Sequence, residues 1–241
     1  VATDAELLAA LTTKAEDHIE HIVINLNADV TLDVAANDAK LIGASLTKDI
    51  TINGIPASRA AEPYTLTFNN TNSDWNHIAT KGAKLILNNL KITNSGKNNG
   101  PWNRHDINFA CEVEMNYVVS DKALAFKAGA TLKNTTITED NASDVYAIWI
   151  QPNGQTVTLE NCNIETTAAT DGRGIKIDEQ YVDSPAKVVL NVSNTTFKTE
   201  EKAAILVKSK AGAEVNASNL DIAGVAADTV YAVWVDEDAA A

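Results

Sequence analysis

One short pattern recurs through most of this chain and restricts what it can fold into. The pattern reads apolar, x, apolar, x, Asn, x, x, apolar, where x is any residue. Asn116, followed by Val119, matches only its second half, because Val113 and Met115 are out of phase, and we expect a bulge there. The asparagines of the full copies are Asn89, Asn134, Asn161, Asn194 and Asn219.

A second apolar-x-apolar segment precedes most of these asparagines, and its period of two predicts a β-strand. No helical pattern separates the strands, so a βαβ sheet is disfavoured and a solenoid is expected, in which each strand pairs in parallel with its counterpart one coil away. Asparagine suits a fixed corner, because it tolerates a left-handed backbone and stacked amides can bond to one another. The segments span residues 107–109, 124–126, 148–150, 175–177, 205–207 and 233–235.

The beginning of the chain predicts a cap on this solenoid. Thr3-Asp4-Ala5-Glu6 has the form of a capping box, and it opens a short helix with Leu7, Leu8 and Leu11 on one face. A terminal coil exposes an apolar end that such a helix can cover. We therefore expect a capping helix in residues 1–18 and a single solenoid domain in 19–241. The stop after the acidic residues 236–238 suggests a missing C-terminal segment or a charged edge.

Charge and composition exclude some classes of partner. The 241 residues include 19 basic and 32 acidic ones, and the net charge of −13 repels nucleic acid. No run of about 18 apolar residues is present, so no transmembrane segment is expected. The chain begins at Val1 without an initiator Met, which favours a protein whose signal peptide has been removed, secreted or held at the cell surface.

Two cysteines, Cys111 and Cys162, lie in strand-like segments of different coils. The two could form a disulfide, but we favour two buried free thiols.

Four segments carry a resemblance to known proteins: residues 5–11, 146–150 with 154–158, 173–178 and 203–208. With these coils the chain resembles the pectin-lyase-like superfamily, and more narrowly uncharacterised secreted proteins of gut Bacteroidetes. The resemblance implies an all-β, single-stranded, right-handed parallel β-helix over nearly the whole chain. The superfamily contains lyases, glycoside hydrolases, esterases, adhesins and phage tail proteins, so this fold does not identify the function.

The outward position of the recurrent strand suggests a ligand-binding face. If the flanking apolar residues point inward, Trp149 and Trp234 lie three coils apart on that face, where indoles can stack on sugar rings. Lys176 and Asn108 would contribute polar contacts. The alternative is that a loop or further C-terminal sequence covers both indoles. The outward column is Asn108, Ala125, Trp149, Lys176, Leu206 and Trp234.

Charged residues beside this face are the candidates for catalysis: Asp171, Arg173, Lys176 and Asp178. A hydrolase needs two carboxylates facing one sugar bond, and a lyase needs a base and commonly calcium. However, the paired-Asp and Gly-His-Gly motifs of polygalacturonases and the Arg-x-Pro-x-x-Arg pattern of pectate lyases are absent. Ion pairs between adjacent coils explain these charges at least as well.

Metal binding has weaker support. His18 and His21 have no partners at zinc-ligand spacing, so no metal site is expected there. Acidic residues that precede several strands could form a row that binds calcium, although a solvated edge is the alternative. This row comprises Glu139, Asp140, Asp144, Asp171, Glu200, Glu201 and Asp228.

The sequence thus favours an exported, non-catalytic β-helix that binds glycan or another surface partner. One alternative is a polysaccharide lyase or glycoside hydrolase acting on a uronate-containing substrate. The other is an adhesin or scaffold module of a larger assembly. Neither the ligand nor the oligomeric state follows from the sequence.

Overall fold

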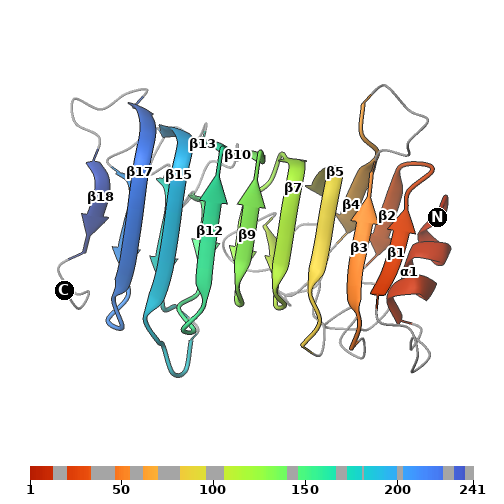
Figure 1. Cartoon of the computed structure of the whole chain (residues 1–241), viewed down its shortest axis with the longest axis horizontal. Coiled ribbons are helices and arrows are strands. Elements are labelled where there is room, and N and C mark those ends of the chain that lie inside the picture. Colours follow the sequence, from red (N-terminus) through yellow and green to blue (C-terminus); the bar gives the residue numbers. More distant parts are fainter. Residues whose placement is uncertain are drawn as a thin grey trace.

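In the residues that the structure describes, the fold is nearly all β, with parallel strands in two sheets and one short helix, as Figure 1 shows. A computed structural model describes residues 1–12, 21–33, 47–54, 62–69, 82–95, 106–139, 146–166, 173–180, 182–199, 203–224 and 231–236. The strands lie side by side along the long axis, with α1 at one end and β18 at the other. The prediction of an all-β chain built from parallel strands is confirmed.

Twelve strands form the first sheet. The chain enters it repeatedly, and strands far apart in sequence, such as β5 and β7, pair in parallel over most of their length. In chain order the strands are β1 (His21–Asn25), β2 (Val30–Asp33), β3 (Asp49–Asn53), β4 (Thr65–Asn69), β5 (Leu85–Asn94), β7 (Val113–Ser120), β9 (Ala130–Lys133), β10 (Thr136–Glu139), β12 (Thr156–Glu160), β13 (Asn163–Thr166), β15 (Val188–Thr199) and β17 (Ala213–Gly224).

Six strands form the second sheet, in the order β18-β16-β14-β11-β8-β6. From β6 onward the chain alternates between the two sheets, so each visit to the second sheet adds a strand beside the previous one. The strands are β6 (Ile107–Phe109), β8 (Leu124–Phe126), β11 (Tyr146–Ile150), β14 (Arg173–Asp178), β16 (Ala203–Lys208) and β18 (Tyr231–Val235).

The core is the space toward which both sheets direct alternate side chains. Apolar residues at the period-two positions stack on their counterparts in the next strand, as Phe109 does on Phe126 with ring centroids 5.9 Å apart. The edge of Phe68 meets Phe109 at 6.4 Å. Each large side chain buried in this way contributes about 1.5–3 kcal/mol, and the sum over many repeats stabilises the fold.

Asparagine does occupy a left-handed corner in the first sheet. The φ angle is 48° at Asn89, 51° at Asn134 and 55° at Asn161, and the same region is occupied by Asn194 and Asn219. Asparagine adopts this conformation more readily than most residues, because its short polar side chain can bond locally. The predicted corner is therefore confirmed at these five positions.

The prediction for Asn116 is wrong, because Tyr117 takes the corner with φ of 56°. Asn116 pairs with Asn88 in straight register, so the expected bulge is absent from this described strand pair. With Tyr117 at the corner, Val113 and Met115 fall in phase and both are buried. The corner of this repeat lies one residue later than the asparagine pattern predicts, because the asparagine here precedes the corner residue.

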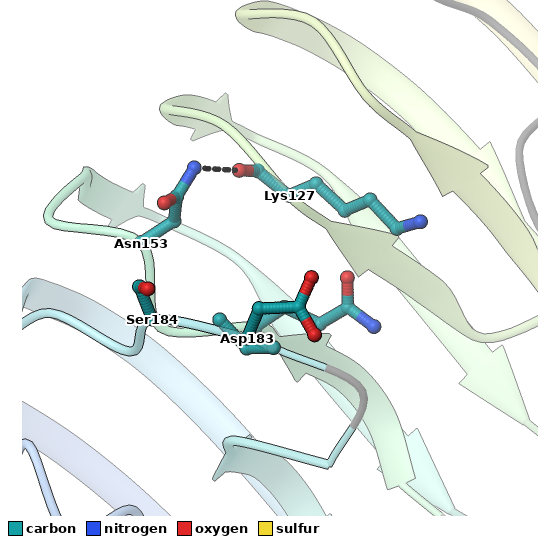
Figure 2. A pocket seen from close by; sticks show the side chains of 6 residues that line it. Lys127, Asn153, Asp183 and Ser184 are labelled. Carbon is teal, nitrogen blue, oxygen red and sulfur yellow. Dashed lines mark hydrogen bonds between the residues drawn. The ribbon is translucent and has the colours of Figure 1, made fainter.

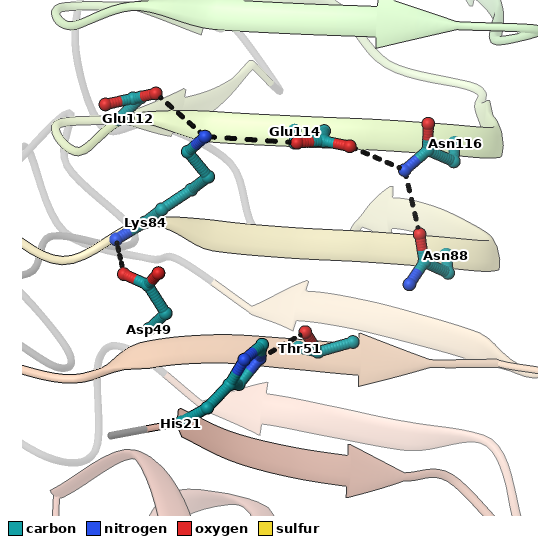
Figure 3. A network of polar contacts seen from close by, with 8 residues as sticks. All are labelled: His21, Asp49, Thr51, Lys84, Asn88, Glu112, Glu114 and Asn116. Carbon is teal, nitrogen blue, oxygen red and sulfur yellow. Dashed lines mark hydrogen bonds and ion pairs between the residues drawn. The ribbon is translucent and has the colours of Figure 1, made fainter.

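Amide ladders run along the first sheet beside these corners. Asn116 Nδ2 donates to Asn88 Oδ1 at 3.0 Å, Asn88 to Asn53 at 3.0 Å, and Asn53 to Asn25 at 2.9 Å. Figure 3 shows the contact between Asn88 and Asn116, next to an ion pair of Lys84 Nζ with Glu112 at 3.1 Å. That ion pair raises the pKa of Lys84. The ladders align successive strands, since these amides reach one another only when the strands are in register.

Toward the other end of the sheet the ladder changes position. Asn219 Nδ2 donates to Asn194 Oδ1 at 2.7 Å, so here the corner residues themselves bond. A second row joins Asn216 to Asn191 at 3.0 Å.

Helix α1 (Asp4–Thr12) packs on the N-terminal end of the core. Leu7 and Leu11 are fully buried there. Thr3 Oγ1 accepts a hydrogen bond from Glu6 N at 3.3 Å, as the capping box predicts, whereas the Glu6 carboxylate accepts from Ala2 N at 2.7 Å. The bond from Ala2 is the main cause of the lowered pKa of Glu6. Residues 13–18 of the predicted cap lie outside the described residues.

Both cysteines are buried and free, which confirms that prediction. Cys162 Sγ donates to the carbonyl of Glu160, two residues before it. Thr135 and Thr195 each donate from Oγ1 to the carbonyl two residues before, so the thiol does at Cys162 what a hydroxyl does in the neighbouring repeats. Burial raises the pKa of the Cys162 thiol.

Candidate functional site

The outward column on the second sheet is present as predicted. Trp149 pairs with Ala125 on one side and with Lys176 on the other, and Leu206 pairs with Trp234. Trp149 and Trp234 are therefore three strand steps apart, roughly 14 Å at the usual spacing between strands. The candidate ligand-binding residues Asn108, Trp149, Lys176 and Trp234 all belong to this column.

The expectation that Trp149 is exposed is wrong. Its side chain is 1% exposed and forms a small cluster with Ala123, Ala125 and Tyr146, separate from the main core. The indole packs against the Tyr146 ring at 5.7 Å, and its Nε1 donates to the carbonyl oxygen of Asp178 at 3.2 Å. A side chain can point away from the core and still be buried, and Trp149 therefore offers no open stacking surface.

Asn108 is also buried, at 1% exposed. An amide at that depth does not offer the surface contact to ligand that the sequence suggested.

Trp234 is 37% exposed and belongs to an aromatic pair on β18. The Tyr231 ring lies 6.2 Å from the Trp234 ring at an interplanar angle of 58°, and Tyr231 is 53% exposed. β11 carries the matching pair of Tyr146 and Trp149 at nearly the same angle, 54°, in the buried cluster. Among the described residues of this sheet, the exposed aromatic pair therefore lies on β18 and includes Tyr231, which the outward column does not contain. The repeated Tyr-Ala-x-Trp motif of residues 146–149 and 231–234 was the available signal.

Lys176 and Asp178, two of the catalytic candidates, form an ion pair. Lys176 Nζ lies 2.9 Å from Asp178 Oδ2, and the two side chains are 8% and 9% exposed. The ammonium also lies 5.7 Å from the centroid of the Tyr146 ring, a cation–π distance. Asp178 Oδ1 in turn accepts from Gln180 N at 3.0 Å. The two charges on β14 thus neutralise each other, and the Tyr146 ring on the neighbouring strand β11 adds a contact to the ammonium.

Arg173 begins β14, where it pairs with Tyr146 on β11. Its partner among the candidates, Asp171, lies outside the described residues. The structure therefore places three of the four catalytic candidates on one strand.

A buried contact that the sequence did not predict joins Asp106 to Tyr146. The Tyr146 hydroxyl donates to Asp106 Oδ2 at 2.7 Å, and both residues are buried. Asn94 Nδ2 donates to the Asp106 carbonyl at 3.2 Å, so the position of Asp106 is defined from two sides. The contact spans 40 residues of sequence, and no local pattern indicates it.

The outer face of the second sheet thus has two parts. The part near β11 and β14 is a buried polar and aromatic cluster, in which Lys176 pairs with Asp178 and the Tyr146 hydroxyl donates to Asp106. The part on β18 is an open aromatic pair. The first is suited to holding loops and strands together, and the second to stacking on a flat ligand.

Of the predicted acidic row, Glu139 is described. It is 3% exposed, and its Oε2 accepts from Ala123 N at 2.5 Å, so this carboxylate supports a turn. The remaining members, Asp140, Asp144, Asp171, Glu200, Glu201 and Asp228, lie outside the described residues, as does His18.

His21 Nε2 lies 2.7 Å from Thr51 Oγ1. Within the described ranges, no group of three or more histidine, cysteine or acidic side chains is arranged to hold a metal ion. A membrane-spanning helix is likewise not found in the part of the chain that the structure describes. Comparisons with protein-family models, curated proteins and solved structures found no match to this chain.

Proposed function

We propose that the two sheets are faces of a right-handed, single-stranded parallel β-helix of the pectin-lyase-like kind. The alternation of the chain between the sheets supports this proposal, because each repeat adds one strand to each face. The corner asparagines and their ladders support it as well, since both repeat once per coil. A crystal structure would test the handedness directly.

We further propose that the protein is exported and binds glycan or a similar surface partner without catalysing a reaction. The observation that carries the proposal is the exposed pair of Tyr231 and Trp234 on β18 of a parallel sheet. Sugar rings stack through their C–H faces on indole and phenol rings, and two rings packed against each other at 6.2 Å can together present one apolar surface for such a ring.

The ion pair of Lys176 and Asp178 supports a non-catalytic role. A catalytic acid or base must reach the substrate, and these two side chains are less than a tenth exposed and bonded to each other. The net charge of −13 also favours a neutral glycan over an acidic one.

The test is binding of a panel of plant and host polysaccharides, measured by affinity electrophoresis. The variants are Tyr231→Ala and Trp234→Ala, and the matched control is Tyr117→Asn, which removes an exposed aromatic ring from the first sheet. We expect retardation by a neutral polysaccharide to be lost in both β18 variants and kept in the control. Binding that survives both alanine substitutions would refute the platform.

One observation favours the alternative of a lyase or hydrolase: Asp106, just before β6, is a buried carboxylate outside the ion pair of Lys176 and Asp178, and it accepts from the Tyr146 hydroxyl. Buried charges outside the main core are costly and often serve chemistry. Release of oligosaccharides from the same panel, with and without calcium, separates the two functions. Unsaturated product ends would indicate a lyase and saturated ends a hydrolase, and Arg173→Ala would then be the first variant.

A further inference from the structure

A pocket of about 280 Å³ opens beside the C-terminal ends of strands β8, β11 and β14 of the second sheet. Figure 2 shows the side chains that line it, with Lys127, Asn153, Asp183 and Ser184 labelled. Lys127 follows β8, Gln151 and Asn153 follow β11, and the segment 182–184 follows β14. The pocket therefore lies where the chain leaves three neighbouring parallel strands at their C-terminal ends.

Backbone hydrogen bonds fix the walls of the pocket. Lys127 N donates to the carbonyl of Phe109 in the preceding strand at 3.0 Å, and Gln151 N donates to that of Phe126 at 3.1 Å. The segment after β14 is joined to the one after β11 by a bond from Gly154 N to the Ala186 carbonyl at 3.3 Å. A pocket framed in this way exists before a ligand arrives, which lowers the entropic cost of binding.

Side-chain bonds hold the β11 side of the wall in the same way. Gln155 Oε1 accepts from Asn153 N at 2.7 Å, and Gln155 Nε2 donates to the Gln151 carbonyl at 2.7 Å. Asn153 Nδ2 donates to the Lys127 carbonyl at 3.5 Å, which connects the wall to β8 (Figure 2). Gly154 has φ of 77°, a conformation that allows this tight turn.

The lining combines donors and acceptors of several kinds. Lys127 supplies an ammonium, Asp183 a carboxylate, Ser184 a hydroxyl, and Asn153 a side-chain amide, while Val182 adds an apolar wall. A sugar hydroxyl both donates and accepts, so it needs neighbours of both kinds, and its ring C–H groups need an apolar surface.

Charge restricts the ligand further. Asp183 and the overall charge of −13 disfavour an anion, and Lys127 disfavours a cation. The volume of about 280 Å³ is slightly below the usual range for ligand pockets, which fits one small molecule. We propose that this pocket binds a single neutral sugar residue, at a site separate from the β18 pair.

The experiment is a titration of the isotope-labelled protein, followed by amide NMR spectra, with glucose, galactose, mannose and N-acetylglucosamine in turn. We expect at least one of these sugars to shift the amides of Lys127, Asn153 and Ser184. Asp183→Ala and Ser184→Ala should each weaken that sugar about tenfold, the effect of losing one good hydrogen bond. Glu214→Ala, which removes an exposed carboxylate from β17, is the matched control and should leave the affinity unchanged.

The result that would overturn the proposal is the absence of shifts at these amides with all four sugars. Tighter binding of glucuronate or inorganic phosphate than of any neutral sugar would also overturn it. Trp234→Ala should leave the titration unaffected, so failure of this pocket and failure of the β18 platform can be told apart.

Discussion

Tyr117 occupies the same left-handed corner as Asn89 in the preceding repeat, with φ of 56° against 48°. The neighbouring residues Asn116 and Asn88 pair directly, so the two corners are aligned across the sheet. Tyrosine lacks the short polar side chain that makes this conformation inexpensive, and Tyr117 is 61% exposed.

Tyr117→Asn should therefore stabilise the protein. The gain expected from relieving the corner is about 0.5–1 kcal/mol, since little packing is lost from an exposed ring. Urea unfolding, followed by circular dichroism, measures it from the shift in midpoint. Asn116→Ala, which removes an amide from the ladder, should shift the midpoint in the opposite direction. A lower midpoint for Tyr117→Asn would mean that the ring contributes contacts that outweigh the strain.

The ion pair of Lys176 and Asp178 should behave as a buried unit. Asp178→Ala leaves the Lys176 ammonium without its carboxylate partner, and we expect a loss of about 3–5 kcal/mol. Replacing both, as Lys176→Met with Asp178→Leu, should bring stability back to within about 1 kcal/mol of the wild type. A double-mutant cycle by denaturant unfolding tests this. Purely additive losses would show that the two charges do not stabilise each other.

Cys162→Thr should be nearly neutral and Cys162→Val should not. Threonine can donate to the Glu160 carbonyl as the thiol does, whereas valine has the same shape without a donor and should cost about 1 kcal/mol. Thermal unfolding of the two variants side by side measures the difference. Equal stabilities would show that the bond to the carbonyl contributes nothing.

Cys162→Thr should also change the dependence of stability on pH. Burial raises the pKa of this thiol, so above its ordinary value near 9 the unfolded chain loses the proton while the folded chain keeps it. The wild type should therefore lose stability relative to Cys162→Thr as pH rises above about 9, and the two should run parallel below. Parallel curves up to pH 11 would contradict the assignment.

Gly174→Ala should destabilise the second sheet. A Cβ at this position would come within 2.5 Å of Phe197 Cδ1 and 2.7 Å of the Ala204 carbonyl oxygen. Overpacking of this kind costs about 1–3 kcal/mol. Gly129→Ala is the matched control, because its Cβ would meet its nearest neighbour at 3.4 Å, and it should stay within about 0.5 kcal/mol of wild type. Similar unfolding midpoints for both variants would mean that the sheet adjusts without cost.

Much of this fold could be predicted because the same strand and corner pattern recurs along the chain. The six apolar-x-apolar segments pair in the predicted register, since a period of two leaves one way to bury both flanking residues. The predicted position of the corner is wrong only in the repeat of Asn116 and Tyr117. Residue type favours asparagine at the corner, but the left-handed backbone is at Tyr117.

The site was less predictable. Strand alternation correctly predicted that Trp149 points away from the core. It carries no information on what else packs on that face, and the ring is buried there. The bond between Tyr146 and Asp106 joins residues 40 apart and depends on which strands become neighbours. The exposed partner of Trp234, Tyr231, could have been found by comparing residues 146–149 with 231–234.

The parallel pairing has a mechanical consequence. The hydrogen bonds between strands run along the long axis of the molecule, and α1 and β18 lie at its two ends (Figure 1). Tension applied between these ends would load one row of bonds at a time rather than shear many rows together. The protein should therefore yield under force in a series of small steps, each releasing about one repeat, and behave as an extensible spacer more than as a rigid rod.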